Sequence, residues 1–90
     1  MNTTSLPQKI QDAVENFLSD EEEILLANGF EDAFIGIARQ FNKPFAVYDR
    51  DKCIQSLLVD MDVDEAEEYF QYNVEGAYIG ELTPAFIQLA

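Results

Sequence analysis

The pattern of hydrophobic and polar positions is most regular between Phe45 and Glu81, where it predicts a strand, a helix, a tight link, a helix and a strand. Two stretches of this unit carry apolar residues every three or four positions, as one face of an α-helix does. The first stripe consists of Cys53, Ile54, Leu57, Leu58 and Met61. The second consists of Ala66, Tyr69, Phe70, Asn73 and Val74. We expect both stripes to face a sheet and the polar side of the second helix to face water, namely Glu67, Glu68, Gln71 and Glu75.

Capping residues mark the ends of these two helices. Asp49 suits the N-cap of the first helix. Asp62, followed three residues later by Glu65, has the spacing of a capping box for the second. Gly76 is predicted to follow the last turn in a left-handed conformation. The sequence therefore predicts two short helices with defined ends.

An amphipathic helix is also predicted for residues 5–18, after a frayed end at residues 1–4. Ser5 is its expected N-cap, with Gln8 three residues later and Pro7 in the first turn. Its apolar stripe consists of Leu6, Ile10, Ala13, Val14, Phe17 and Leu18. We expect this stripe to pack on the domain's own sheet; packing on a partner is the alternative.

The remaining apolar runs predict strands. Residues 33–41 and 45–48 form a predicted hairpin, in which Gly36 marks a bulge or a close neighbour and Pro44 occupies the first strand position. Ser19 and Glu22 repeat the capping-box spacing, and residues 24–27 then end a short helix at Gly29 or form a strand before an Asn-Gly turn. The strand is favoured for 24–27. Two further strands are predicted at 77–81 and 85–89.

These elements predict one α+β domain over residues 1–90. We expect an antiparallel sheet of about four to five strands, with the two central helices on one face. The N-terminal helix is expected to pack elsewhere or in the same layer.

The charge is strongly acidic, with 18 Asp and Glu against 5 Lys and Arg, a net charge of −13. Direct binding to nucleic acid or to an anionic membrane is disfavoured, because both require basic counter-charge. The 48% of hydrophobic residues is compatible with a folded core. No apolar run approaches the roughly 18–20 residues of a membrane span, and no secretory leader is evident. With a single cysteine, an intracellular, reducing compartment is expected.

The charge is also unevenly distributed along the chain. Four of the five basic residues lie between Arg39 and Lys52, and only acidic charges follow Lys52. This separation permits self-association between unlike faces. The net negative charge also fits a partner protein with a basic surface. The plainest interpretation is that this charge keeps a small domain soluble.

Several phrases of the sequence resemble a known family. They are GFEDAFIGIARQFNKPFAVYDRDKCI (29–54), DEAEEYFQYNVEGAYIGE (64–81) and TPAFI (83–87). They are similar to a family of short uncharacterised proteins encoded by tailed bacteriophages and found in marine metagenomes. The similarity covers residues 29–87 and leaves out the N-terminal helix. It implies a viral accessory protein in the cytoplasm of an infected bacterium, and it implies no catalytic residue.

Candidate chemistry is sparse. The chain has no histidine and no glycine-rich phosphate loop, which removes the commonest general base and the usual nucleotide-binding motif. Cys53 falls in the first turn of a predicted helix, where the helix dipole lowers a thiol pKa. Its place on the apolar stripe favours a structural role instead.

Three groups of charged residues are candidate sites. The Asp60, Asp62, Asp64 and Glu65 run has calcium-loop character but lacks the glycine at position six and the glutamate at position twelve. Asp49, Arg50, Asp51 and Lys52 form a mixed-charge cluster at a strand-to-helix junction, for which capping is the plainer account. Glu31 and Asp32 would form a carboxylate site if they met Glu81 across the sheet.

The aromatic residues Tyr69, Tyr72 and Tyr78 offer a stacking surface, but their neighbours are acidic, so a core or interface role is favoured. We therefore assign no catalytic, cofactor-binding or metal-binding residue. The expected function is a non-enzymatic protein–protein interaction module that binds a host or viral protein and can form a homo-oligomer. The alternatives are a DNA-mimic inhibitor of a nucleic-acid-binding protein and a small carboxylate- or metal-dependent enzyme or ligand-binding domain.

Overall fold

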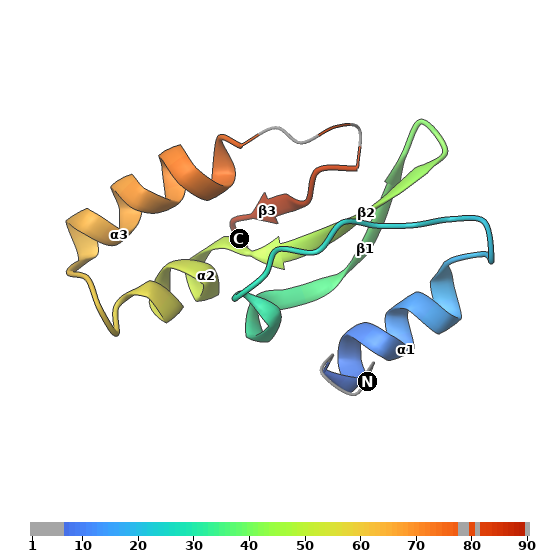
Figure 1. Cartoon of the computed structure of the whole chain (residues 1–90), viewed down its shortest axis with the longest axis horizontal. Coiled ribbons are helices and arrows are strands. Elements are labelled where there is room, and N and C mark those ends of the chain that lie inside the picture. The colour runs from blue at the N-terminus through green and yellow to red at the C-terminus, as the bar shows by residue number, and fades with distance from the viewer. Residues whose placement is uncertain (1–6, 78–79, 81, 90) are drawn as a thin grey trace.

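The computed structural model describes residues 7–77, 80 and 82–89 (Figure 1). In chain order its elements are α1 (Gln8–Phe17), the 3-10 turn η2 (Glu31–Ala33), β1 (Phe34–Gln40), β2 (Lys43–Asp49), α2 (Arg50–Leu57), α3 (Val63–Phe70), the π-helical turn η3 (Gln71–Glu75) and β3 (Ala85–Ile87). The α+β class is as predicted. None of the helices within these residues is long and apolar enough to span a bilayer.

The sheet of the described residues has three strands in the order β1-β2-β3. β1 pairs with β2 antiparallel, whereas β2 pairs with β3 in parallel. The expectation of four to five antiparallel strands is therefore wrong for this part of the chain. The physical reason is the connection: α2 and α3 form a crossover between β2 and β3, and a crossover returns the chain in the same direction.

The segment 24–27 is neither strand nor helix. Ile24, Leu26 and Ala27 instead pack their side chains against the core, and the Ala27 N–H donates a hydrogen bond to the Tyr48 hydroxyl at 2.8 Å. Buried contacts and one long-range hydrogen bond thus hold the segment in place without β-sheet hydrogen bonds to a neighbouring strand. A turn follows, in which Phe30 N–H donates to the Ala27 carbonyl and Gly29 has φ +92°. The predicted strand 77–81 includes residues 78, 79 and 81, which lie outside the described residues.

The β1–β2 hairpin forms as expected, with bounds of 34–40 and 43–49. Phe41 and Asn42 at its tip have φ of 56° and 64°, the left-handed values of a tight two-residue turn. A register shift between Phe34 and Gly36 confirms a bulge at this glycine. Pro44 is the second strand residue, not the first.

Capping geometry confirms most of the predicted helix ends. The Asp49 carboxylate accepts from the Lys52 N–H at 3.2 Å, and Asp62 and Glu65 form the reciprocal capping box of α3. α1 begins at Gln8 with Pro7 in the N-cap position. The N-cap predicted at Ser5 lies outside the described residues. Glu22 accepts from the Ser19 N–H at 3.0 Å, but a turn follows and no helix.

Gly76 does not adopt the predicted left-handed conformation, since its φ is −85°. Its N–H donates to the Gln71 carbonyl at 2.9 Å, five residues back, and so closes η3. A Cβ at this position would lie 2.7 Å from the Gln71 carbonyl oxygen. Glycine is therefore needed here for space rather than for a positive φ.

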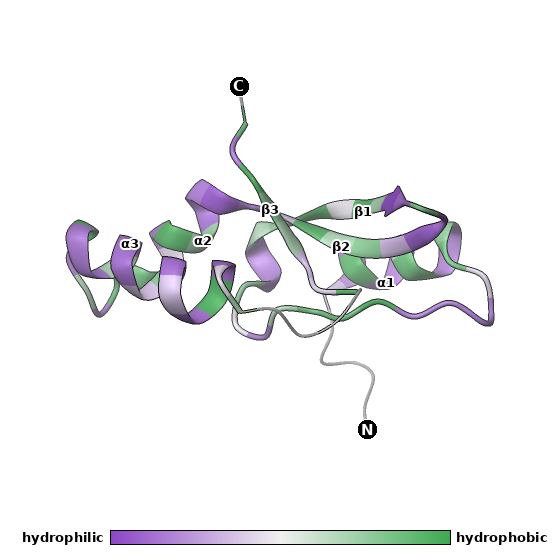
Figure 2. Cartoon of the chain, turned by 90° about the horizontal axis from the view of Figure 1, so that it is seen from above, coloured by the Kyte–Doolittle hydropathy of each residue, from purple (hydrophilic) through white to green (hydrophobic). Residues whose placement is uncertain are grey.

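The predicted placement of the helices is not what the structure shows. α1 lies under one face of the sheet, whereas α2 and α3 form a pair beyond its end (Figures 1 and 2). The apolar sides of α2 and α3 still point inward: Ile54 and Phe70 are buried, and Phe70 packs edge-on against Phe86 of β3 and Phe30. Leu58 and Tyr69, predicted to face inward, are 39% and 41% exposed. The single core is thus shared by the sheet, all three helices and the loop before β1.

Candidate functional site

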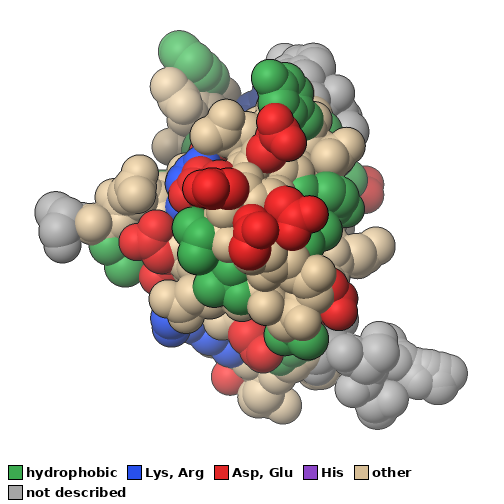
Figure 3. All heavy atoms as spheres, turned by 90° about the vertical axis from the view of Figure 1, so that its left-hand side faces the viewer, with side chains coloured by type: hydrophobic (Ala, Val, Ile, Leu, Met, Phe, Trp, Pro, Cys, Tyr) green, Lys and Arg blue, Asp and Glu red, His purple; other side chains and the backbone are tan. Residues whose placement is uncertain are grey.

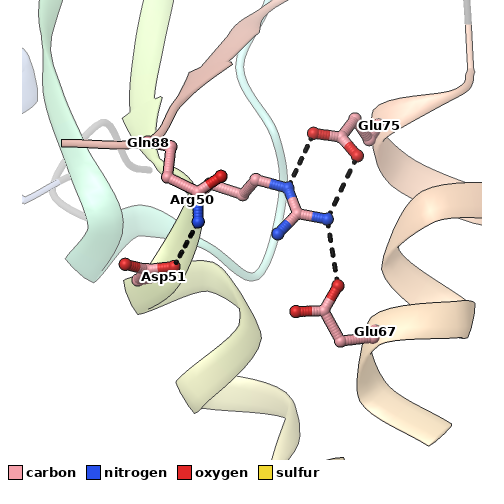
Figure 4. Close-up of polar contacts among 5 residues, drawn as sticks. All are labelled: Arg50, Asp51, Glu67, Glu75 and Gln88. Atoms are coloured by element: carbon pink, nitrogen blue, oxygen red, sulfur yellow. Dashed lines mark hydrogen bonds and ion pairs between the residues drawn. The ribbon is translucent and has the colours of Figure 1, made fainter. Parts of the chain in front are cut away.

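The mixed-charge cluster at the β2–α2 junction is centred on Arg50 (Figure 4). Arg50 donates from Nε to Glu75 Oε2 at 2.8 Å, and from Nη2 to Glu67 Oε1 at 3.1 Å. Its side chain is 12% exposed, and its guanidinium carbon lies 5.5 Å from the ring centroid of Phe70. These hydrogen bonds raise the pKa of Arg50. The side chains of Glu67 and Glu75 are 41% and 35% exposed, in line with the prediction that they face water, and they also anchor α3 and η3 to the start of α2.

The other charges of this junction also have structural partners. Asp49 is 8% exposed and caps α2, while Asp51 accepts from the Gln88 amide at 3.5 Å, which links α2 to the chain beyond β3 (Figure 4). The interpretation of Asp49 as a capping residue is confirmed. The junction is therefore a structural clamp, and the candidate site lies on the other side of α3.

A surface pocket of about 370 Å³ lies there, which we call the acidic–aromatic pocket. It is lined by Met61, Glu65, Glu68, Tyr69, Tyr72 and Asn73. Met61 comes from the link between α2 and α3, and the others from α3 and η3. Figure 3 faces the α2–α3 end of the molecule and shows acidic side chains among exposed hydrophobic ones.

Helical spacing explains why these side chains meet. Glu65 and Glu68 are three residues apart, as are Tyr69 and Tyr72, and residues at this spacing are neighbours on a helix surface. The change from α-helix to the π-helical turn η3 falls between Phe70 and Gln71, within the segment that lines the pocket. Single π turns occur frequently at functional sites.

The pocket side chains are accessible and carry uncompensated negative charge. Tyr72 is 76% exposed and Tyr69 is 41% exposed. Glu65 uses one oxygen to accept from the Asp62 N–H at 3.2 Å, and Glu68 forms no ion pair with any residue that the structure describes. No Lys or Arg follows Lys52 in the sequence. Carboxylates beside tyrosine rings attract a cation through charge and through the ring face, and they repel phosphate.

Cys53 is a core residue. Its side chain is fully buried, and burial, assisted by the nearby Asp49 charge, raises the pKa of the thiol to about 12. Burial therefore outweighs the helix dipole, which would lower the pKa of the Cys53 thiol and make it reactive. The structural interpretation of Cys53 is therefore the one that the geometry supports.

The remaining acidic candidates have local structural partners or lie partly outside the described residues. Asp62 and Glu65 of the calcium-like run bond each other's backbone in the capping box. Glu31 accepts from the Gly29 N–H at 3.1 Å and Asp32 is exposed, while Glu81 lies outside the described residues, as does Tyr78. Within the described part of the chain, no three Cys, Asp or Glu side chains are grouped so as to hold a metal ion.

The pocket as a unit was not predicted from the sequence. The spacing of Glu65, Glu68, Tyr69 and Tyr72 already indicates that they share one side of a helix. The sequence did not predict the pocket because Tyr69 and Asn73 were expected to face the core. The π-helical turn, which the sequence did not predict, follows Tyr69 and contributes Tyr72 and Asn73 to the pocket.

Comparison with known proteins adds no relative: no protein-family model, no curated protein and no solved structure matches this chain. The resemblance to tailed-phage proteins stays a prediction.

Proposed function

We propose that this chain is a non-enzymatic protein-interaction module that binds a lysine- or arginine-bearing segment of a partner protein in the acidic–aromatic pocket. The observation that carries the proposal is the combination, in one concave site, of exposed Tyr72 and Tyr69 with the carboxylates of Glu65 and Glu68. A cationic side chain placed there would lie against a tyrosine ring and within reach of a carboxylate. Cation–π contacts contribute about 0.5–1 kcal/mol at exposed sites and more when desolvated.

The charge of the whole chain supports the same partner chemistry. A net charge of −13 steers a basic partner toward the molecule and increases the association rate. The surface charge alone would attract any cation without selecting a site. The tyrosines supply the local contact that distinguishes the pocket from the rest of the acidic surface. On the phage resemblance, the partner would be a host or viral protein in the cytoplasm of an infected bacterium.

The two alternative functions have less support. A DNA mimic presents carboxylates in place of phosphates, but on α3 and η3 the exposed residues Val63, Tyr69 and Tyr72 interrupt the acidic side chains. An enzyme that uses carboxylates or a metal would need such groups gathered at a cleft. In the pocket, one oxygen of Glu65 accepts a helix-cap hydrogen bond, and within the described residues no third carboxylate joins Glu65 and Glu68 there.

Calorimetric titration with a short peptide containing Arg and Lys tests the proposal. Tyr72→Ala is expected to weaken binding about five- to tenfold, which corresponds to about 1 kcal/mol for the lost ring contact. Glu68→Gln should weaken it by a similar factor. The matched control is Glu21→Gln, which removes one exposed carboxylate far from the pocket in the sequence.

The control decides between a site and a general charge effect. If Glu21→Gln weakens binding as much as Glu68→Gln, and Tyr72→Ala has no effect, the peptide recognises only net charge and the proposed pocket is wrong. If no binding is measured at low salt, the proposal fails altogether.

A further inference from the structure

One face of the three-stranded sheet has no cover among the described elements. α1 and the segment before β1 lie on the opposite face, and Figure 2 shows no helix on this side of the strands. Side chains alternate between faces along a strand. The uncovered side, which we call the open sheet face, has six uncharged residues at its centre: Gly36, Ala38, Phe45, Val47, Ala85 and Ile87. Lys43 lies on the same side at the hairpin end of β2, and Asp49, the register partner of Ile87, lies on it at the other end.

Strand register confirms that these residues share one face. Gly36 is paired with Val47, and Ala38 with Phe45, across β1 and β2. Val47 is paired with Ala85 across β2 and β3. The residues between them, such as Ala46 and Tyr48, are fully buried on the other side. The open sheet face is therefore continuous across all three strands.

The centre of the open sheet face is apolar and does not contact the core. Phe45 and Val47 are partly exposed, Ile87 is 37% exposed, and none of the three belongs to the core cluster of the described residues or packs against it. A hydrophobic sheet face is normally buried against another layer. Small residues at Gly36, Ala38 and Ala85 keep it flat, so a second sheet can approach closely.

We propose that a second copy of this chain covers the open sheet face, sheet against sheet, around a two-fold axis. The argument rests on charge. A two-fold contact places a surface against itself, so acidic residues near the axis would meet acidic residues. The chain carries 18 acidic side chains, yet the six central residues of this face are uncharged, and Asp49 at its edge is 8% exposed and caps α2. The face lets two strongly acidic molecules meet without apposing carboxylates.

The ends of the face favour one orientation. Lys43 lies on the same side as Phe45 and Val47, at the hairpin end of β2, whereas Asp51 follows the other end of β2. When the strands of the two copies run in opposite directions, Lys43 of one copy approaches the Asp51 end of the other. Aligned sheet packing of this kind keeps the two layers about 10 Å apart. This contact uses a different surface from the acidic–aromatic pocket, so the test of the dimer is independent of the test of the proposed function.

Sedimentation equilibrium over a concentration series tests the dimer. The unmodified chain is expected to dimerise with a dissociation constant in about the micromolar range. Phe45→Glu and Phe45→Lys should each sediment as monomers, because like charges then meet near the axis. An equimolar mixture of the two variants should regain the dimer, because Glu then meets Lys; a misfolded variant could not produce this recovery.

The control pair is Val59→Glu and Val59→Lys, at a residue that is 84% exposed on the link between α2 and α3. Both control variants should dimerise as the unmodified chain does. A chain that remains monomeric at about 1 mM would overturn the proposal. So would a dimer that persists in both Phe45 variants, since the copies would then meet elsewhere. If the Phe45 variants lose their circular dichroism spectrum, Ala38→Glu on the edge strand replaces them, with the same expected loss of the dimer.

Discussion

Arg50 and Glu75 are joined by two hydrogen bonds, from Nε to Oε2 at 2.8 Å and from Nη2 to Oε1 at 3.3 Å. Glu75 is the last residue of η3, and Arg50 is the first residue of α2. The pair therefore fixes the π-helical turn to the end of the sheet. Because Tyr72 lies in the same turn, this bond on one side of the helix holds the pocket in place on the other.

Arg50→Lys tests this clamp. Lysine keeps the charge but cannot form the paired hydrogen bonds of a guanidinium, and it loses the flat contact with Phe70. The free energy of unfolding should fall by about 1 kcal/mol in urea titration. Arg39→Lys is the matched control: Arg39 also donates twice to one carboxylate, that of Glu22, but its side chain is 45% exposed. A larger loss for Arg39→Lys would contradict the assigned role of Arg50.

Gly76→Ala should destabilise the fold by about 1–3 kcal/mol, because the new methyl group would meet the Gln71 carbonyl oxygen and open η3. Gly36→Ala is the control, since a Cβ there meets nothing within 4 Å and φ is not positive. Its effect should stay within about 0.5 kcal/mol. Equal effects in thermal unfolding would show that the close approach at Gly76 is not the reason for its glycine.

The thiol of Cys53 should not react with a disulfide reagent at about pH 8 while the protein is folded. Its pKa is raised from 9.0 to about 12, so the thiolate is scarce, and the side chain is also fully buried. Because the raised pKa favours the protonated folded state, this contribution to stability is present below pH 9 and is lost toward pH 12. Absorbance should show labelling only after urea is added. Rapid labelling of the folded chain would contradict the core assignment.

Glu22 should make stability depend on acid. Hydrogen bonds from Arg39 and from the Ser19 N–H lower its pKa from 4.5 to about 2. Its contribution is therefore complete above pH 4.5 and is lost as the pH falls toward 2. The difference in unfolding free energy between the unmodified chain and Glu22→Gln should stay constant above pH 4.5 and shrink as the pH falls from 4.5 to about 2. Glu23→Gln, at an exposed neighbour, should show no such change.

Local patterns predicted the local structure well. The capping box of Asp62 and Glu65, the cap at Asp49, the bulge at Gly36 and the hairpin were all readable because each depends on residues close in sequence. The inward side of both central helices was also correct for Ile54 and Phe70. These features need no knowledge of the rest of the chain.

Long-range pairing was not predictable in the same way. Residues 24–27 have strand composition, but the Tyr48 hydroxyl and the core hold them without a neighbouring strand. The parallel pairing of β3 depends on how the α2–α3 crossover returns the chain. The ion pairs of Arg50 join residues 17 and 25 positions apart, so the sequence indicated that Glu67 and Glu75 are exposed but not that they pair with Arg50. The pocket depends on this arrangement and on η3, and it became visible only in three dimensions.

The most direct measurement is a nitrogen–proton correlation spectrum of the labelled chain, recorded while the Arg- and Lys-containing peptide is added. The proposed function predicts that the amide shifts cluster between Met61 and Asn73, around the acidic–aromatic pocket. Shifts spread over every acidic segment, including residues 20–23, or confined to the hairpin of β1 and β2, would contradict it.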